Sequence, residues 1–128
     1  MVCGDGEFTM GCNALWTAAH EKIPLLLIVA NNRSYFNDEL HQATVARVRG
    51  RPQQNAWIGQ RIEDPAPDIA VIAKGFGLDG AGLVEKLEDL ASALETAFAA
   101  VRAGRPYVLD VIVDREYSTS PITTSRKA

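Results

Sequence analysis

The sequence predicts an α/β domain built on a doubly wound parallel sheet with helices on both faces. Residues 25–30 form a continuous β-favouring run, which is typical of a strand buried on both faces of a parallel sheet. Residues 86–103 repeat apolar side chains at steps of three and four, the period of an amphipathic helix. Because strands and helices of this kind alternate along the chain, they favour parallel strands joined by helical crossovers.

The N-terminal part predicts a strand, a turn and a helix. Residues 1–3 form a short strand that ends at Gly4-Asp5-Gly6. We expect one helix over residues 9–22, closed by Pro24, because the residue before a proline is pushed out of helical geometry. A sheet whose first strand has three residues lacks its beginning, so we expect a domain that is truncated at its N-terminus.

The middle of the chain is predicted to be a long loop. Residues 42–63 show little periodicity and contain two glycines and a proline, so we expect one short helix there at most. A helix over residues 67–76 and a weak strand over residues 82–84 follow. The last strand is expected at residues 107–113, after the helix that ends at Gly104.

Length and composition narrow the classes of protein. The 128 residues suffice for one domain, which we place at residues 1–117, with a flexible tail at 118–128. Thirteen basic and sixteen acidic residues give a net charge of −3, which disfavours binding to nucleic acid or to an anionic membrane. Cys3 and Cys12 fit neither a zinc spacing nor a CxxC redox pair, so we expect a reducing, cytoplasmic compartment.

Two polar segments follow the first two predicted strands, namely GDG at 4–6 and NN at 31–32. Glycines allow a tight exit from a strand and let a ligand approach the backbone, and a helix that follows favours phosphate oxygens. A carboxylate at Asp5 beside phosphate requires a cation between them, and Mg²⁺ or Ca²⁺ prefers such oxygen ligands. Parallel neighbouring strands would bring the amide of Asn32 close to Asp5. The two segments therefore predict a metal–diphosphate site.

These segments also carry a family resemblance. GDG, then 24 residues, then NN resembles the thiamine diphosphate signature of the pyruvate decarboxylase and acetolactate synthase superfamily. The text around it, GDGEFTMGCNALWTAAHEKIPLLLIVANNRSYFNDELHQ, resembles the C-terminal cofactor domain of acetolactate-synthase-like and benzoylformate-decarboxylase-like enzymes, and the similarity extends over residues 1–114. The resemblance implies a thiamine diphosphate- and Mg²⁺-dependent lyase or transferase that decarboxylates or joins a 2-oxo acid.

The resemblance also implies roles for particular residues. The cofactor-binding set comprises Gly4, Asp5, Gly6, Glu7, Asn32 and Ser34. Within it, the side chains of Asp5 and Asn32 and the backbone carbonyl of Ser34 match the metal ligands, and the backbone N–H groups of Gly6 and Glu7 match the diphosphate contacts. Glu7 departs from the small residue usual at its position, and its carboxylate must point away from a diphosphate.

Asn37 and Asp38 match positions that line the space over the thiazolium, where the substrate reacts, so the resemblance makes them candidate catalytic residues. In pyruvate-decarboxylase-like members an acidic residue near this place assists proton transfer, whereas acetolactate-synthase-like members use other residues. An alternative role is structural, with Asn37 as a helix N-cap and Asp38 as an acid in the first turn.

The resemblance implies partners that the chain does not contain. Family members carry a pyrimidine-binding domain, act on a small 2-oxo acid and assemble as homodimers or homotetramers, so we expect this chain to be inactive alone. Two alternatives remain open. One is a non-catalytic diphosphate-binding or regulatory module, and the other is a different doubly wound Mg²⁺-phosphate protein. The second would need another acid or a nucleophile beside Asp5.

A basic stretch lies in the predicted loop. No acidic residue occurs from His41 to Arg61, and this stretch holds four arginines, at positions 47, 49, 51 and 61. It suits a solvated loop or a domain interface. An anion clamp for a carboxylate or coenzyme A substrate is the alternative, because arginine matches planar anions.

Overall fold

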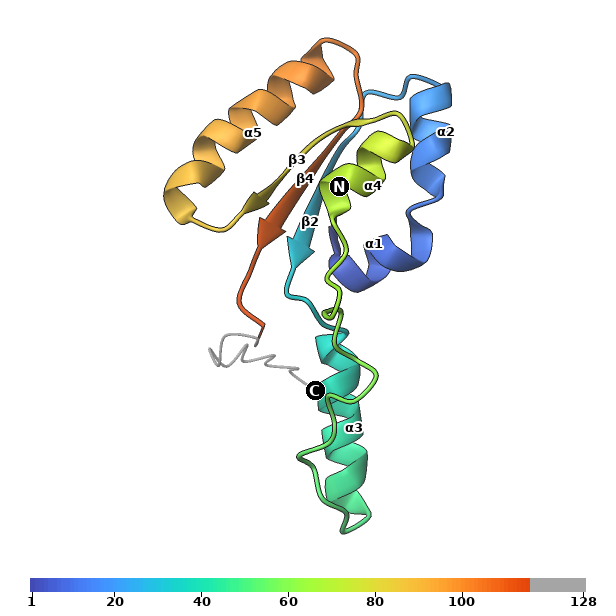
Figure 1. Ribbon diagram of the computed structural model, residues 1–128, viewed down its shortest axis with the longest axis vertical. Coiled ribbons are helices and arrows are strands. Elements are labelled where there is room, and N and C mark those ends of the chain that lie inside the picture. The colour runs from blue at the N-terminus through green and yellow to red at the C-terminus, as the bar shows by residue number, and fades with distance from the viewer. Residues whose placement is uncertain (116–128) are drawn as a thin grey trace, which may run out of the picture.

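The computed structural model describes residues 1–115, and its centre is one parallel sheet (Figure 1). Every neighbouring pair of strands is parallel, and the order across the sheet is β1-β2-β4-β3. The strands are β1 (Val2–Gly4), β2 (Leu26–Asn31), β3 (Asp79–Val84) and β4 (Tyr107–Ile112). The predicted fold class is confirmed. The predicted domain end at residue 117 and the tail at 118–128 lie outside the described residues.

Helices cover both faces of this sheet (Figure 1). One face carries α5, and the other carries α1, α2 and α4. The helices are α1 (Asp5–Gly11), α2 (Ala14–His20), α3 (Phe36–Val48), α4 (Ile69–Gly75) and α5 (Leu87–Arg102). Among the described residues, we find no helix with the length and apolar character that a membrane span requires.

The core consists of two apolar layers that share the central strands. Because successive side chains of a strand point to opposite faces, Leu27 and Val29 pack with Phe8 of α1, Leu15 of α2 and Ile69 of α4. Their neighbours Leu26 and Ile28 pack on the other face, with Ala97 and Ala100 of α5. Helices thus pack on both faces of β2, but its residues are fully buried only on the α1, α2 and α4 side and partly buried on the α5 side, so the predicted burial on both faces is met only in part.

The single helix predicted over residues 9–22 is wrong. The segment contains two short helices, α1 and α2, and α1 begins at Asp5 inside the GDG turn. The early start has a local cause, because the carboxylate of Glu7 turns back and accepts a hydrogen bond from the N–H of Gly4 at 3.0 Å. This contact satisfies a backbone donor at the helix N-terminus that the helix itself leaves unpaired.

The long loop predicted over residues 42–63 is also wrong in its first part. Helix α3 continues to Val48, and only the return segment after it is irregular. In Figure 1, α3 and its return segment extend away from the carboxyl end of the sheet. The apolar residues of α3 do not gather on one face, so the sequence shows no helical periodicity from which this helix could be predicted. Strand β3 likewise begins at Asp79, three residues before its predicted start.

Candidate functional site

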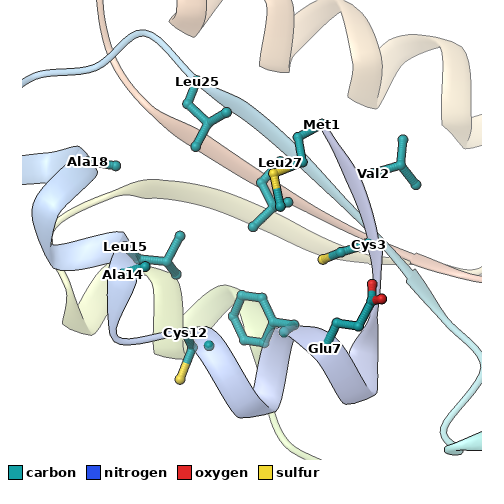
Figure 2. Close-up of a pocket in the computed structure, with 12 residues that line it drawn as sticks. Met1, Val2, Cys3, Glu7, Cys12, Ala14, Leu15, Ala18, Leu25 and Leu27 are labelled. Carbon is teal, nitrogen blue, oxygen red and sulfur yellow. The ribbon is translucent and has the colours of Figure 1, made fainter.

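Two pockets flank α1, and they differ in chemistry. The larger, of about 510 Å³, lies among β1, α1, α2 and the start of β2 (Figure 2). Its lining is mostly apolar and includes Phe8, Leu15 and Leu27, together with Cys3 and Cys12. Burial raises the pKa of the Cys3 thiol, and the carboxylates of Glu7 and Asp5 raise it further. This pocket offers few polar groups to orient a ligand.

The second pocket, of about 360 Å³, opens where β1 and β2 end. Gly4 of β1 pairs in register with Ala30 of β2, so the residues that follow the two strands lie side by side. The pocket brings together every site residue predicted from the sequence: Gly4, Asp5, Gly6, Glu7, Asn32, Ser34, Asn37 and Asp38. Carboxyl ends of parallel strands are the usual place for ligands in open α/β sheets.

Asp5 is the most unusual side chain of this second pocket, which we call the Asp5 pocket. It is 2% exposed, and within the part of the chain that the structure describes its Oδ2 has no hydrogen-bond partner. Burial raises the pKa of the Asp5 carboxyl, while backbone N–H groups lower it, those of Asn32 and Ser34 among them. A buried carboxylate oxygen without a partner is costly. A bound cation would satisfy it.

The Asn32–Ser34 turn faces this carboxylate. Arg33 has a positive φ of 57°, and the side-chain amides of the two asparagines that precede it hold the turn. Asn31 Oδ1 accepts from the N–H of Arg33 at 3.1 Å, and Asn32 Oδ1 accepts from the N–H of Ser34 at 3.0 Å. An amide oxygen has two lone pairs, so Asn32 Oδ1 can still bind a cation.

The oxygen atoms of this pocket suit a hard cation to which the protein supplies only a few ligands. Across residues 1–115, no three His, Cys, Asp or Glu side chains gather in a way that could hold a metal. A cation here would therefore depend on one carboxylate, at Asp5, with neutral oxygens from the Asn32–Ser34 turn. Mg²⁺ is commonly bound by one or two carboxylates together with phosphate oxygens and water, so the residues present fit this ion.

The structure accounts for the two glycines of the GDG turn differently from the sequence, which suggests a tight turn and a close approach of ligand. A Cβ at Gly6 would lie 2.5 Å from Cε1 of Tyr35, so glycine allows the tyrosine ring to pack on the turn. Gly4 has an ordinary extended backbone with φ −79°, and a Cβ there would meet nothing within 4 Å. Close packing within the protein explains Gly6, whereas Gly4, which lines the Asp5 pocket, has room for a Cβ.

The remaining predicted residues lie toward the mouth of the pocket. Glu7 is exposed, and its carboxylate accepts a hydrogen bond from the N–H of Gly4. The expectation that it points away from a diphosphate stays a prediction. Asn37 and Asp38 are exposed in the first turn of α3. The alternative role of Asn37 as the N-cap is wrong, because Tyr35 occupies that position.

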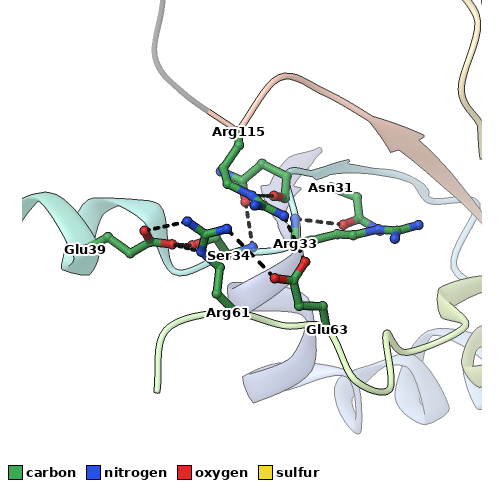
Figure 3. A network of polar contacts seen from close by, with 8 residues as sticks. Asn31, Arg33, Ser34, Glu39, Arg61, Glu63 and Arg115 are labelled. Atoms are coloured by element: carbon green, nitrogen blue, oxygen red, sulfur yellow. Dashed lines mark hydrogen bonds and ion pairs between the residues drawn. The ribbon is translucent and has the colours of Figure 1, made fainter. Parts of the chain in front are cut away.

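A polar network beside the Asp5 pocket was missed by sequence reasoning (Figure 3). Glu39 of α3 accepts hydrogen bonds from Arg61 at 2.7 and 3.2 Å and a further one from the hydroxyl of Ser34. Glu63 contacts Arg61 at 3.8 Å and Arg115 at 2.9 Å. Arg115 also donates to the backbone carbonyl of Asn32 at 3.4 Å.

The only sequence signal for this network is the basic stretch that ends at Arg61. Its members divide in the structure. Arg47, Arg49 and Arg51 are exposed on α3 and the segment after it, in agreement with a solvated region, whereas the partly buried Arg61 forms an ion pair with Glu39. A partner 22 residues away follows no helical or strand period, so spacing alone does not reveal the pair.

The parallel sheet and the polar pocket at its carboxyl edge define a ligand-binding domain of the open α/β class. The chain belongs to the thiamine pyrophosphate enzyme family, as its C-terminal TPP binding domain, and the family model matches residues 1–111. Thiamine pyrophosphate and thiamine diphosphate are two names for the same cofactor. The family resemblance predicted from the two sequence segments is thus confirmed.

Relatives and a solved structure agree with this assignment. The chain is 30% identical over 110 residues to a benzoylformate decarboxylase of Pseudomonas aeruginosa, covering 86% of this chain and 18% of the relative. It is 30% identical over 133 residues to a probable chloroplastic acetolactate synthase of Oryza sativa, covering 99% of this chain and 19% of the relative. A thiamine diphosphate-dependent 4-hydroxybenzoylformate decarboxylase of Rhodococcus jostii superposes with a TM-score of 0.71 at 28% identity, covering 90% of this chain and 19% of that one. The chain thus spans about a fifth of the length of these proteins.

Proposed function

We propose that this chain forms the diphosphate- and Mg²⁺-binding part of a thiamine diphosphate-dependent enzyme that decarboxylates or joins 2-oxo acids. The observation that carries the proposal is the buried, unpartnered Oδ2 of Asp5, which lies in one pocket with Asn32 and Ser34. The names of the relatives, benzoylformate decarboxylase and acetolactate synthase, support the substrate class.

In this proposal some residues of the Asp5 pocket bind the metal ion and others bind the diphosphate. The Asp5 carboxylate, the Asn32 amide oxygen and the Ser34 carbonyl hold Mg²⁺, and the backbone N–H groups of Gly6 and Glu7, in the first turn of α1, bind diphosphate oxygens. Thiamine diphosphate, when bound, supplies the electron sink for breaking or forming the bond next to the keto carbon.

Asn37 and Asp38 are proposed to act on the substrate side of the same pocket. Both are exposed and line its wall. There Asn37 would orient a substrate oxygen through its amide, and the Asp38 carboxyl would take up or release a proton.

The proposal includes the rest of the enzyme. We propose that a pyrimidine-binding domain completes the cofactor site, that the whole protein is a cytoplasmic homodimer or homotetramer, and that this chain alone does not catalyse. The spans of the relatives support a larger protein, because this chain covers only 18–20% of their length in three of the alignments.

Calorimetric titration of the full-length protein with thiamine diphosphate, with and without Mg²⁺, tests the function. We expect saturable heat that appears with Mg²⁺ and is lost when the metal is chelated. The matched control is the variant Glu95→Gln, which changes an exposed carboxylate on α5 and leaves the pocket intact. Absence of any Mg²⁺-dependent heat in a folded full-length protein would contradict the proposal.

A further inference from the structure

We infer that the ion pair between Glu39 and Arg61 positions the Asn32–Ser34 turn for the cation, so that Glu39 and Arg61 are positioning residues of the cofactor site. This inference rests on the proposed function of the Asp5 pocket. It assigns a role to two side chains that lie outside the GDG and NN segments and outside the lining of the Asp5 pocket.

Glu39 contacts the Asn32–Ser34 turn through the side chain of Ser34. Glu39 is 7% exposed and Ser34 is 5% exposed, and the hydroxyl of Ser34 donates to Oε1 of Glu39. The same oxygen accepts from Nε of Arg61 at 2.7 Å, and Oε2 accepts from Nη2 at 3.2 Å. A two-point contact between a guanidinium and a carboxylate fixes the direction of both groups. The carboxylate of Glu39 that Arg61 holds in this way also accepts the hydrogen bond from Ser34 (Figure 3), so it orients the Ser34 side chain.

The backbone around Arg61 is also bound to the same turn. Ser34 and Arg61 form an isolated antiparallel bridge. On its two sides, the N–H of Tyr35 donates to the carbonyl of Gln60 at 2.9 Å, and the N–H of Ile62 donates to the carbonyl of Arg33 at 2.9 Å. The segment 60–62 therefore lies along residues 33–35, and the Glu39–Arg61 pair ties that segment to α3.

The conformation of this turn also requires contacts from outside the turn. Arg33 has a left-handed backbone with φ 57°, a conformation that is unfavourable for a residue other than glycine and persists only where the surroundings hold it. The Ser34 carbonyl, a proposed ligand, follows this residue directly. Groups that orient metal ligands without touching the metal commonly affect affinity by about 10–100-fold.

The experiment measures Mg²⁺ binding to the full-length protein at saturating thiamine diphosphate, by calorimetry, well below the unfolding temperature of each variant. Ser34→Ala removes only the hydroxyl that reaches Glu39, and Glu39→Ala removes the acceptor. We expect Mg²⁺ affinity to fall about tenfold in Ser34→Ala and about 10–100-fold in Glu39→Ala. Glu39→Gln, which keeps an acceptor for Ser34, should recover part of the loss.

The double variant separates positioning through Ser34 from an unrelated effect. If Glu39 acts through the Ser34 hydroxyl, Ser34→Ala adds nothing to Glu39→Ala, because coupled residues are not additive. The matched control is Glu95→Ala on the exposed face of α5, which should bind Mg²⁺ as the wild type does. Thermal unfolding without metal reports the purely structural part of each change.

The outcomes distinguish the inference from the proposed function. Normal Mg²⁺ affinity in Glu39→Ala, with a lowered unfolding temperature, would overturn the positioning role and leave the proposed function intact. If Glu39→Ala does not fold, Ser34→Ala decides, and unchanged affinity there overturns the inference. Absence of Mg²⁺ binding in the wild type would refute both.

Discussion

Two buried aspartates near the carboxyl edge of the sheet have nearly the same exposure and different surroundings. Asp5, at the start of α1, is 2% exposed, and Asp110 of β4 is 3% exposed. Burial raises the pKa of both carboxyls. Asp110 accepts a hydrogen bond from Nδ2 of Asn31 at 3.0 Å, and the charge of Arg33 also lowers its pKa. The groups that lower the pKa of Asp5 are backbone N–H groups, and its Oδ2 stays without a partner among the described residues.

The difference indicates that the two aspartates have different roles. Asp110 orients Asn31, whose amide oxygen in turn binds the N–H of Arg33, so its carboxylate is part of the protein's own hydrogen bonding. Asp5 carries a similar desolvation cost with one oxygen unsatisfied, and the residue lines the Asp5 pocket. Buried polar atoms without partners are rare in proteins and call for an explanation. Equal burial is therefore a poor guide to function, and the missing partner is the informative observation.

The largest expected effect is the loss of cofactor binding when the charge of Asp5 is removed. Asp5→Asn should weaken Mg²⁺-dependent binding of thiamine diphosphate by more than about 100-fold, since loss of an outer partner alone commonly costs about 10–100-fold. Asp110→Asn, the matched change, keeps an acceptor for Asn31 and should weaken binding by less than about tenfold, the lower end of that range. Calorimetric titration of both full-length variants checks this prediction, and equal losses would erase the contrast between the two aspartates.

A smaller effect is expected at the glycine beside each aspartate. A Cβ at Gly6 would lie 2.5 Å from the Tyr35 ring, and a Cβ at Gly82 would lie 2.6 Å from Cβ of Asp110. Gly6→Ala should displace Tyr35, which lines the Asp5 pocket, and should weaken cofactor binding by about tenfold, a cost of 1.4 kcal/mol. Gly82→Ala should lower the free energy of unfolding by about 1–3 kcal/mol, as overpacking does, with normal binding by the folded fraction.

Urea unfolding and titration of the same samples measure both quantities. Gly4→Ala is the control, because a Cβ there would meet nothing within 4 Å, and it should leave the free energy of unfolding nearly unchanged. Loss of binding in Gly82→Ala with full stability would show that the two regions are not separate.

The smallest expected effect concerns stability and pH in the metal-free protein. A carboxyl whose pKa is raised by folding stabilises the fold fully below its unfolded value, near 3.8, and that contribution is lost as the pH rises through the folded pKa. At pH 7 both Asp5→Asn and Asp110→Asn should therefore unfold at a higher temperature than the wild type. The difference should vanish as the pH falls toward 3.8.

Thermal unfolding at a series of pH values, from about 3.5 to about 7.5, checks the sign for each variant. This range runs from just below the ordinary pKa of an aspartate, about 3.9, to well above it. Addition of Mg²⁺ and thiamine diphosphate should stabilise the wild type and Asp110→Asn by mass action, and should leave Asp5→Asn unchanged. A variant that unfolds at a lower temperature than the wild type at pH 7 would mean that its carboxylate, in spite of burial, stabilises the metal-free fold.

Local patterns predicted the parts of the molecule that depend on local physics. The apolar run of β2 reflects a strand with helices on both faces, and the three-and-four spacing of α5 reflects a helix that is buried on one face. Both elements lie within two residues of their expected bounds. The GDG and NN segments predicted the residues of one pocket, because parallel strands necessarily bring their carboxyl ends together.

The parts that were missed depend on contacts between distant residues. Tyr35 packs on Gly6 across 29 positions, and Arg61 reaches Glu39 across 22. No helical or strand period encodes such pairs. The helix start at Asp5 was missed because the glycines that flank it resemble a turn, whereas the backward contact of Glu7 with Gly4 begins the helix there.

The most direct test of the central claim is a crystal structure of the full-length protein with thiamine diphosphate and Mn²⁺ in place of Mg²⁺, with the metal located by its anomalous scattering. We expect one peak bound by a carboxylate oxygen of Asp5, the side-chain oxygen of Asn32 and the carbonyl of Ser34, at about 2.0–2.2 Å, close to the distances typical of Mg²⁺. A metal bound elsewhere, with Oδ2 of Asp5 and Oδ1 of Asn32 too far apart to share it, would contradict the account.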